Sequence, residues 1–170
     1  MDVVAILDSV TDVARSDDRP VLVAYDHSDE AVAALRNAVT LFPLRTLIVV
    51  SVWEPGLARA MASLSGVAPG SPSSEVIAEI NRVERDLAAE AANAGASLAR
   101  ELGATAQPIA ITDRADVAAA IAMEANRHDV CAISVGSRGL GRVAAPLLGS
   151  TSQALLRHTR HPVLVVRAPE

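Results

Sequence analysis

A glycine-rich segment near the C-terminus holds the residues best suited to chemistry in this sequence. Gly136 and Gly139 follow an apolar run, and Gly149 opens the stretch Gly-Ser-Thr-Ser. Glycine lets backbone N–H groups approach an anion closely, and a helix N-terminus offers unpaired N–H groups and a favourable dipole. The segment predicts either a phosphate cradle or an ordinary strand-to-helix loop.

The common nucleotide motifs do not fit this segment. A Walker A loop needs a lysine, but all 15 basic residues are arginine. The same absence excludes a pyridoxal enzyme and a protein kinase. The glycine spacing is the reverse of G-x-G-x-x-G. Two arginines of the segment, Arg138 and Arg142, are expected either to face solvent or to pair with phosphate.

No catalytic constellation is recognisable. Nucleophilic catalysis needs a nucleophile, a base and a residue that orients the base. The sequence offers four histidines without a nucleophile motif, and we expect structural or surface roles for them: His27, His128, His158 and His161. The carboxylate pairs Asp17-Asp18 and Asp29-Glu30 suit helix starts better than acid–base catalysis. No metal cluster is apparent, and Cys131 is expected to be inert in a buried strand.

Composition narrows the class of protein. The chain has 170 residues, of which 51% are hydrophobic and 2% aromatic, so we expect one aliphatic core. With a net charge of −5 and no basic run, nucleic acid and anionic lipid are unlikely partners. The longest uncharged stretch, residues 60–74, is too short to span a bilayer. Because there is no signal-like N-terminus and only one cysteine, we expect a cytoplasmic location.

Apolar runs and helical periodicity alternate along the chain. The helical stretches separate five near-continuous apolar runs, which are residues 20–25, 46–53, 104–112, 130–135 and 162–167. Such runs are typical of parallel strands covered on both faces. The order βαβαβαβαβ predicts an α/β fold, a parallel sheet with right-handed crossovers. The longest helix is expected over about residues 74–102, and residues 54–73 are expected to form a long loop.

The N-terminus adds an element to this alternation. Residues 2–15 place apolar side chains at helical spacing, which predicts an amphipathic helix. This helix is expected either to dock on its own domain or to bind a partner. The predicted organisation is therefore an N-terminal helical extension over residues 1–18 and an α/β domain over residues 19–170 that contains the candidate phosphate cradle.

Taken together, the motifs resemble the universal stress protein family. Gly136-x2-Gly139-x9-Gly149-Ser150 resembles its ATP-binding signature, and further matches lie at residues 21–28, Trp53-Glu54, 135–139 and 161–166. The resemblance extends from about residue 20 to residue 167. Two positions depart from the family pattern, since His27 follows the aspartate and Asp113 stands where a glycine is common.

The resemblance implies a five-stranded Rossmann-like sheet of order 3-2-1-4-5, a homodimer through the last strand, and ATP bound without a P-loop. Carried over by position, the implied nucleotide-binding residues are Ala24, Asp26, Val52, Val135, Gly136, Gly139, Gly149, Ser150, Thr151 and Ser152. ADP or AMP are alternatives to ATP, and Mg²⁺ is expected to arrive with the nucleotide because it coordinates phosphates and water.

The expected function is that of an ATP-binding stress-response or signalling protein with little or no turnover, whose nucleotide occupancy changes conformation or partner binding. Two alternatives remain, a dimeric scaffold that binds no nucleotide and a slow nucleotide hydrolase. In the first reading, the loop over residues 54–73 either closes over the nucleotide, with Leu57, Met61 and Leu64 burying apolar area, or is a plain connector. The downstream protein partner is unknown at this stage.

Overall fold

A single parallel sheet of five strands organises the fold. In this computed structural model, residues 18–55, 74–113, 116–137 and 149–168 are described. The strands are β1 (Val21–Ala24), β2 (Leu47–Trp53), β3 (Ala106–Thr112), β4 (Ala132–Gly136) and β5 (Val163–Val166). They lie in the order β3-β2-β1-β4-β5, and every neighbouring pair is parallel. This confirms the expected sheet.

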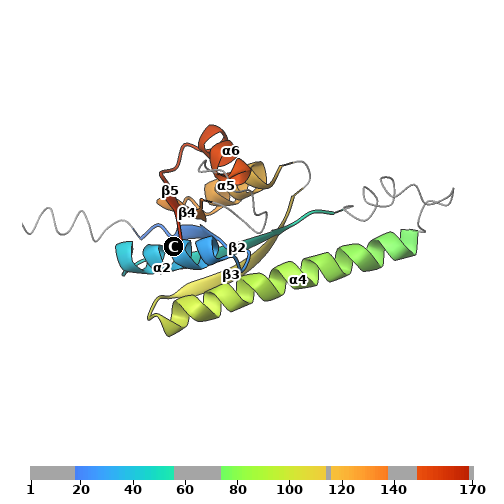
Figure 1. The fold of residues 1–170 in the computed structure, drawn as a ribbon, viewed down its shortest axis with the longest axis horizontal. Helices are drawn as coiled ribbons and strands as arrows, with labels where there is room; N and C mark the ends of the chain where they lie inside the picture. Colours follow the sequence, from blue (N-terminus) through green and yellow to red (C-terminus); the bar gives the residue numbers. More distant parts are fainter. Residues whose placement is uncertain (1–17, 56–73, 114–115, 138–148, 169–170) are drawn as a thin grey trace, which may run out of the picture.

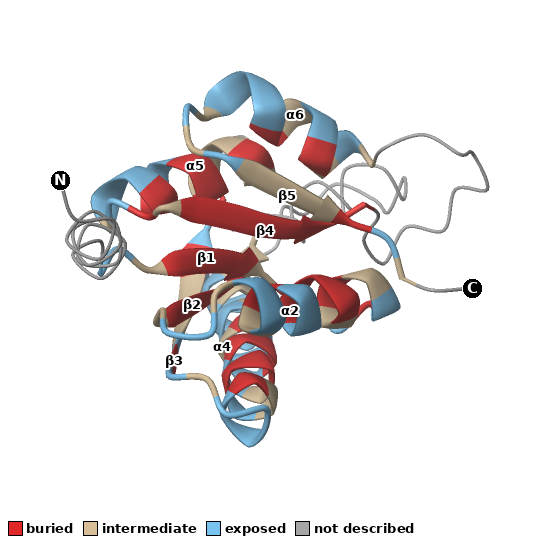
Figure 2. Ribbon diagram, turned by 90° about the vertical axis from the view of Figure 1, so that its left-hand side faces the viewer, coloured by how far each residue is buried: buried red, intermediate tan, exposed pale blue. Residues whose placement is uncertain are grey.

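In the described part of the chain, four helices cover the two faces of the sheet (Figure 1). They are α2 (Asp29–Leu41), α4 (Ser74–Glu101), α5 (Val117–Arg127) and α6 (Ser150–His158). Helices α2 and α4 pack in one hydrophobic cluster with the sheet, and α5 and α6 pack in the other. Figure 2 shows the buried strands between these two helical layers. The fold is therefore a doubly wound α/β sandwich.

Successive residues of each inner strand enter opposite clusters. In β1, Val21 and Val23 join the cluster under α2 and α4, whereas Leu22 joins the cluster under α5. All three are 0% exposed. Because side chains alternate across a sheet, burial on both faces requires apolar residues at every position. This explains the continuous apolar runs of the sequence, whose predicted bounds differ from the observed strands by one or two residues at most ends.

Short polar side chains set the helix starts. Ser28 is the N-cap of α2, where its Oγ accepts a hydrogen bond from Ala31 N at 3.1 Å. Asp116 caps α5 in the same way, accepting from Ala118 N at 2.8 Å. Asp29 and Glu30 lie in the first turn of α2, as expected of acids near a helix N-terminus. Gly103 follows α4 with a φ of 90°, a conformation that glycine adopts readily.

Two expectations concern residues that the structure does not describe. The amphipathic helix over residues 2–15 lies outside the described residues, and so does nearly all of the expected loop, from residue 56 to residue 73. One expectation is corrected. Cys131 precedes β4 and is only partly buried, because the strand begins at Ala132. None of the helices that the structure describes is long and apolar enough to cross a membrane.

Candidate functional site

The functional site is expected where the strand order reverses. Strands β1 and β4 are neighbours, and the helices that follow them, α2 and α6, pack on opposite faces of the sheet. In such sheets the connections diverge at the carboxyl ends of the two strands, which opens a crevice for ligands. Asp26 follows β1 and Ser137 follows β4 at this edge. The predicted site residues in the described ranges therefore cluster at the switch point.

Asp26 is held in place by the start of α2. Its Oδ1 accepts two hydrogen bonds, from Ser28 N at 3.0 Å and from Ser28 Oγ at 2.6 Å. Ser28 is 8% exposed, whereas Asp26 is only partly buried. One carboxylate oxygen thus fixes the turn, and Oδ2 has no hydrogen-bond partner among the described residues. Sequence reasoning did not assign Ser28 to the site, although its N-cap position was readable as the first polar residue before a helix.

A short backbone bridge joins β4 to α6. Ser137 N donates to Val166 O of β5 at 2.6 Å, and Ser137 O accepts from Gly149 N at 2.6 Å. Gly136 itself lies within β4, paired with Val166. These bonds bring Gly136 and Gly149, which are separated in sequence, to one place. The structure thus joins both described glycines of the predicted cradle, whereas Gly139 lies outside the described residues.

The first N–H groups of α6 have no hydrogen-bond acceptor among the residues that the structure describes. Gly149 is the N-cap and supplies no side-chain hydrogen bond, so the first N–H groups of the helix, from Ser150 to Ser152, lack the usual capping acceptor. Ser150 is exposed and Thr151 is partly buried. Ser152 is different, because it is 1% exposed and its Oγ donates back to Gly149 O at 2.9 Å. Its hydroxyl is therefore engaged in the local turn, and its N–H is the group suited to an anion.

Ser137 is a second residue that sequence reasoning did not assign to the site. It is 2% exposed, and its Oγ is the one buried side-chain N or O atom without a hydrogen-bond partner among the described residues. A buried hydroxyl left unpaired costs about 1–3 kcal/mol, and such atoms in native folds call for an explanation, a ligand being one. The signal in the sequence was a serine between the two glycines of Gly136-Ser137-x-Gly139.

The strand ends beside these polar groups are apolar. Ala24, Val52 and Val135 lie at the ends of three adjacent strands and belong to, or pack against, the hydrophobic cluster on the α5 and α6 face. Ala24 and Val52 are partly exposed, whereas Val135 is 6% exposed. Apolar walls with a few convergent polar groups are typical of small-molecule sites. The arrangement suits a ligand with one flat apolar part and one anionic part.

The acid after β1 is followed by a strained residue. His27 is exposed and has a φ of 65°, which is uncommon for residues other than glycine. Tyr25, two residues earlier, is 7% exposed, and burial together with the nearby Asp26 carboxylate raises the pKa of its phenol. A phenol with a raised pKa stays neutral at physiological pH.

The remaining histidines have structural partners, as expected. His128 Nε2 lies 2.9 Å from Glu124 Oε1, His158 Nε2 lies 3.1 Å from Asp116 Oδ2, and His161 Nε2 lies 3.0 Å from Asn126 Oδ1. These contacts link α5 with its own C-terminal turn, with α6 and with the turn before β5. Among the described residues, no group of three or more His, Cys, Asp or Glu side chains could hold a metal ion.

The sequence and the fold of this chain are similar to those of known proteins. Residues 19–167 match the model of the universal stress protein family. Universal stress protein UspA from Lactobacillus plantarum has a similar fold, with a TM-score of 0.67, 21% identity, and coverage of 88% of this chain and 98% of that one. Among the curated proteins, none matches the sequence.

Two similar structures contain nucleotides. The universal stress protein from Archaeoglobus fulgidus in complex with dAMP has a TM-score of 0.59 at 21% identity, covering 87% of this chain and 97% of that one. A universal stress protein family protein from Arabidopsis thaliana with AMP bound has a TM-score of 0.57 at 16% identity, covering 89% and 92%. At these identities, the likeness shows the shared fold.

Proposed function

The chain belongs to the universal stress protein family, and from that premise we propose that it binds an adenine nucleotide, ATP in the first place, at the switch point between β1 and β4. Nucleotide occupancy then changes the conformation or the partner binding of the protein, with little or no turnover. The observation that carries the proposal is the convergence of an oriented carboxylate, an uncapped helix N-terminus and an orphaned buried hydroxyl at one edge of the sheet.

The roles of the residues follow from their chemistry. Asp26 accepts hydrogen bonds from the adenosine part through Oδ2, while Ala24 and Val52 contact the base. Val135 and Gly136 border the ribose, and the N–H groups at the start of α6, from Gly149 to Ser152, bind the phosphate chain. The hydroxyl groups of Ser150 and Thr151 add donors. Gly139, outside the described residues, completes the cradle in this proposal.

ATP, ADP and AMP differ in the number of phosphates that need partners. The dipole and the N–H groups of a helix N-terminus can bind an anion when no lysine is present. This mode of binding suits a chain that contains no lysine. Mg²⁺ would be held mainly by the phosphates and water. The structures of similar proteins with dAMP and AMP support the adenine nucleotide class, and ATP is our choice within it because of the glycine signature.

The test is nucleotide release followed by titration. Mass spectrometry of the denatured purified protein identifies any nucleotide that co-purifies, and calorimetry with ATP, ADP and AMP measures the affinities. Gly149→Val should lower ATP affinity by about tenfold, because a branched side chain would stand where the phosphate approaches. The backbone at Gly149, with a φ of −61°, accommodates valine without strain, so the fold should survive.

A matched control and two contrary outcomes make this test decisive. Gln153→Val places the same side chain one turn further along α6, at an exposed position, and should leave ATP affinity unchanged. A folded wild-type protein that binds none of the three nucleotides would favour the scaffold alternative. Steady release of phosphate from ATP over many turnovers would favour the hydrolase alternative instead.

Homodimerisation through β5 is part of the proposal. Among the described strands, β5 pairs only with β4, so one edge of β5 is available. Val163, Leu164 and Val165 on it are only partly buried. An edge strand of apolar residues invites pairing, and a two-fold contact between copies would protect it. A cytoplasmic location is likewise proposed, because a lone cysteine suits a reducing compartment.

A further inference from the structure

The N-terminal half of α4 extends beyond the sheet. Figure 1 shows the helix running well past the ends of the strands. All six buried residues of α4 lie between Ala88 and Ala99, and none lies between Ser74 and Leu87. Helices of globular proteins bury an apolar stripe to be stable. The first half of α4 therefore carries a surface whose purpose the nucleotide site does not explain.

An apolar stripe runs along this projecting half. Val76, Ile80, Val83 and Leu87 follow the spacing 4-3-4, and at 3.6 residues per turn they fall within an arc of about 60°. Val76, Val83 and Leu87 are 49%, 45% and 57% exposed. The stripe points about 120° away from the alanine face that packs on the sheet. Its spacing is the one by which a helix packs against a partner helix.

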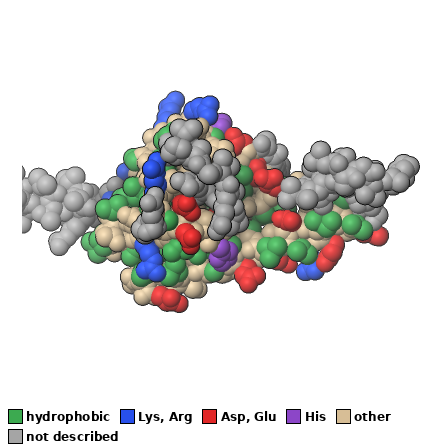
Figure 3. Space-filling model, in the orientation of Figure 1, with side chains coloured by type: hydrophobic (Ala, Val, Ile, Leu, Met, Phe, Trp, Pro, Cys, Tyr) green, Lys and Arg blue, Asp and Glu red, His purple; other side chains and the backbone are tan. Residues whose placement is uncertain are grey.

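The charges beside the stripe are of one sign. On one flank lie Glu79 and Asp86, and on the other lies Glu84, each about 70–90° from the centre of the stripe. The arginines of the same half, Arg82 and Arg85, lie more than about 120° from that centre. Figure 3 shows acidic and hydrophobic side chains interspersed along the projecting part of α4.

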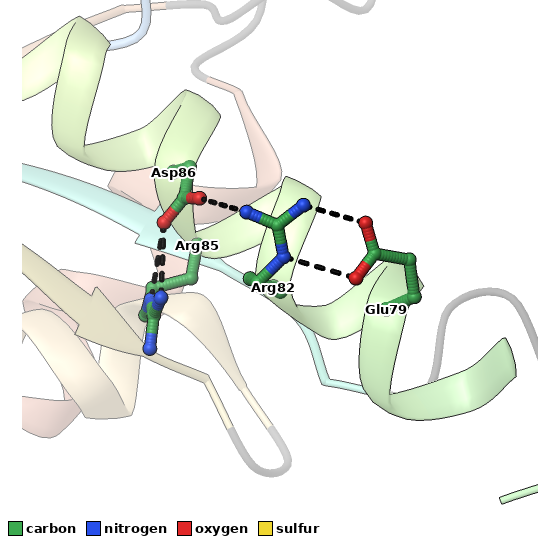
Figure 4. Close-up of polar contacts among 4 residues, drawn as sticks. All are labelled: Glu79, Arg82, Arg85 and Asp86. Carbon is green, nitrogen blue, oxygen red and sulfur yellow. Dashed lines mark hydrogen bonds and ion pairs between the residues drawn. The ribbon is translucent and has the colours of Figure 1, made fainter. Parts of the chain in front are cut away.

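Arg82 forms hydrogen bonds with both acids of one flank, Glu79 and Asp86. Its guanidinium forms a two-point contact with Glu79, with Nη2 at 2.6 Å from Oε1 and Nε at 3.0 Å from Oε2, and its Nη1 lies 3.4 Å from Asp86 Oδ2. Figure 4 shows this chain of contacts, which Arg85 extends to the other oxygen of Asp86. Glu79 and Asp86 are thus ion-paired with the two arginines of the same helix, and Arg82 lowers the pKa of Glu79. Residues 74–90 still carry five acids against two arginines, so this half of α4 keeps a net negative charge.

We propose that the surface made by Val76, Ile80, Val83, Leu87 and their acidic flanks docks a basic amphipathic helix of a partner protein. The apolar stripe receives the apolar face of that helix, and Glu79, Glu84 and Asp86 meet lysine or arginine on both of its sides. Charge selects this occupant. A second copy of α4 would set carboxylates against carboxylates at the flanking positions, which is unfavourable.

The chain's own N-terminal segment is a poorer occupant for the same reason. Residues 2–15 contain three aspartates and one arginine, so they also oppose the acidic flanks. The proposal goes beyond nucleotide binding, since the surface lies on α4 and shares no residue with the crevice between β1 and β4. It places on the fold a surface through which a sensor can meet its target.

Three labelled peptides test the proposal by fluorescence anisotropy. The first is a designed helix of about four turns with leucine in a 4-3-4 stripe and lysine on both flanks. The second has glutamate in place of lysine, and the third keeps the lysines but has serine in place of leucine. We expect the first peptide to bind at least about tenfold more tightly than the other two.

Variants of the chain locate the binding. Val83→Glu combined with Leu87→Glu should weaken the first peptide by at least about tenfold, and both positions are exposed, so the fold should persist by circular dichroism. Leu44→Glu is the matched control, because Leu44 is 93% exposed on the connection between α2 and β2, and it should change nothing. ATP affinity should be the same in all variants, which separates this surface from the nucleotide site.

Several outcomes would overturn the proposal. If the glutamate peptide bound as tightly as the lysine peptide, charge would be irrelevant. If the Val83→Glu, Leu87→Glu variant bound the first peptide as tightly as the wild type, the stripe would be irrelevant. Wild-type self-association in analytical ultracentrifugation that disappears in the Val83→Glu, Leu87→Glu variant, without peptide binding, would assign the surface to a second copy instead. No binding of the first peptide to the wild type would also contradict it.

Discussion

The imidazole of His27 meets the ring of Tyr25 edge-on, with 5.3 Å between the ring centroids and 67° between the planes. Tyr25 is buried in the hydrophobic cluster under α2 and α4, whereas His27 is exposed. The contact therefore ties the residue after Asp26 to the core. His27 itself has a φ of 65°, in the left-handed region, where Asn, Asp and His are the non-glycine residues found most often.

Substitutions at His27 should separate the ring contact from the backbone conformation. His27→Gly loses the ring contact but relieves the backbone, so its free energy of unfolding should stay within about 1 kcal/mol of the wild type. His27→Val loses the contact and adds a branched side chain at positive φ, so it should be less stable than His27→Gly by about 1–3 kcal/mol. Urea titration measures both. Equal stability of the two variants would mean that the backbone at this position is unstrained.

Close packing of α4 on the sheet depends on Gly95. A methyl group at this position would lie 2.8 Å from Val49 Cγ1 and 2.9 Å from Tyr25 Cδ1, both in stiff, buried side chains. Overpacking of this kind costs about 1–3 kcal/mol, and better helix propensity returns about 1 kcal/mol. Gly95→Ala should therefore lower the free energy of unfolding by up to about 2 kcal/mol.

The control for Gly95 lies on the same helix. Asn93 is exposed, so Asn93→Ala meets no neighbour and should be neutral or slightly stabilising through helix propensity. Thermal unfolding of the two variants should differ by several degrees, at about 2–4 °C for each kcal/mol in a chain of this size. A stabilised Gly95→Ala variant would show that α4 can shift away from the sheet without cost.

The pH dependence of stability should include a contribution from Asp116. The pKa of its carboxyl is lowered, first by the hydrogen bond from Ala118 N and also by the imidazole of His158. A lowered folded-state pKa stabilises the fold above the unfolded pKa of about 3.9, and this contribution is lost as the pH falls through the folded-state pKa. Asp116→Asn keeps a capping acceptor without the charge. Its unfolding free energy should be lower than that of the wild type at pH 7, and the difference should shrink below about pH 3.9. A difference that stays constant with pH would show that the charge of Asp116 does not contribute.

The proposed dimer through β5 has its own test. Val165→Pro removes a backbone donor from the edge strand and should give monomers or aggregates. Val165→Thr keeps the donor and a similar shape at this partly buried position, and should remain dimeric. Analytical ultracentrifugation at micromolar concentration distinguishes them. A monomeric wild type would contradict the dimer and leave the fold unaffected.

Much of this fold was predictable because burial on both faces leaves a clear pattern. Each inner strand, such as β1, must be apolar at every position, and the sequence between the strands keeps helical spacing. The strand order was predicted from the family resemblance, since no local pattern encodes which strands are neighbours. The start of α2 was indicated by the acids Asp29 and Glu30, which lie in its first turn.

The site was less predictable, because its chemistry depends on which polar atoms remain unpaired. Sequence alone cannot show that Ser152 Oγ turns back to Gly149 O, while Ser137 Oγ is left without a partner. Both serines are buried. The backbone contact that brings Ser137 to Gly149 joins residues 12 positions apart, which no local pattern reveals. The stripe on α4 was likewise hidden, because exposure depends on where the sheet ends.

Ser137 makes the most discriminating prediction, since one substitution should move stability and affinity in opposite directions. Its unpaired Oγ is buried at 2% exposure beside the N-terminus of α6. Removing a buried hydroxyl without a partner stabilises the free protein, so Ser137→Ala should raise the free energy of unfolding without nucleotide by about 1 kcal/mol. If the hydroxyl donates to bound nucleotide, the same variant should bind ATP several-fold more weakly, by about 1 kcal/mol. Ser134→Ala is the control, because Ser134 Oγ already donates to Ala34 O at 3.0 Å; it should lose stability and keep its ATP affinity. A Ser137→Ala variant that gains stability with unchanged ATP affinity would remove the hydroxyl from the proposed nucleotide site.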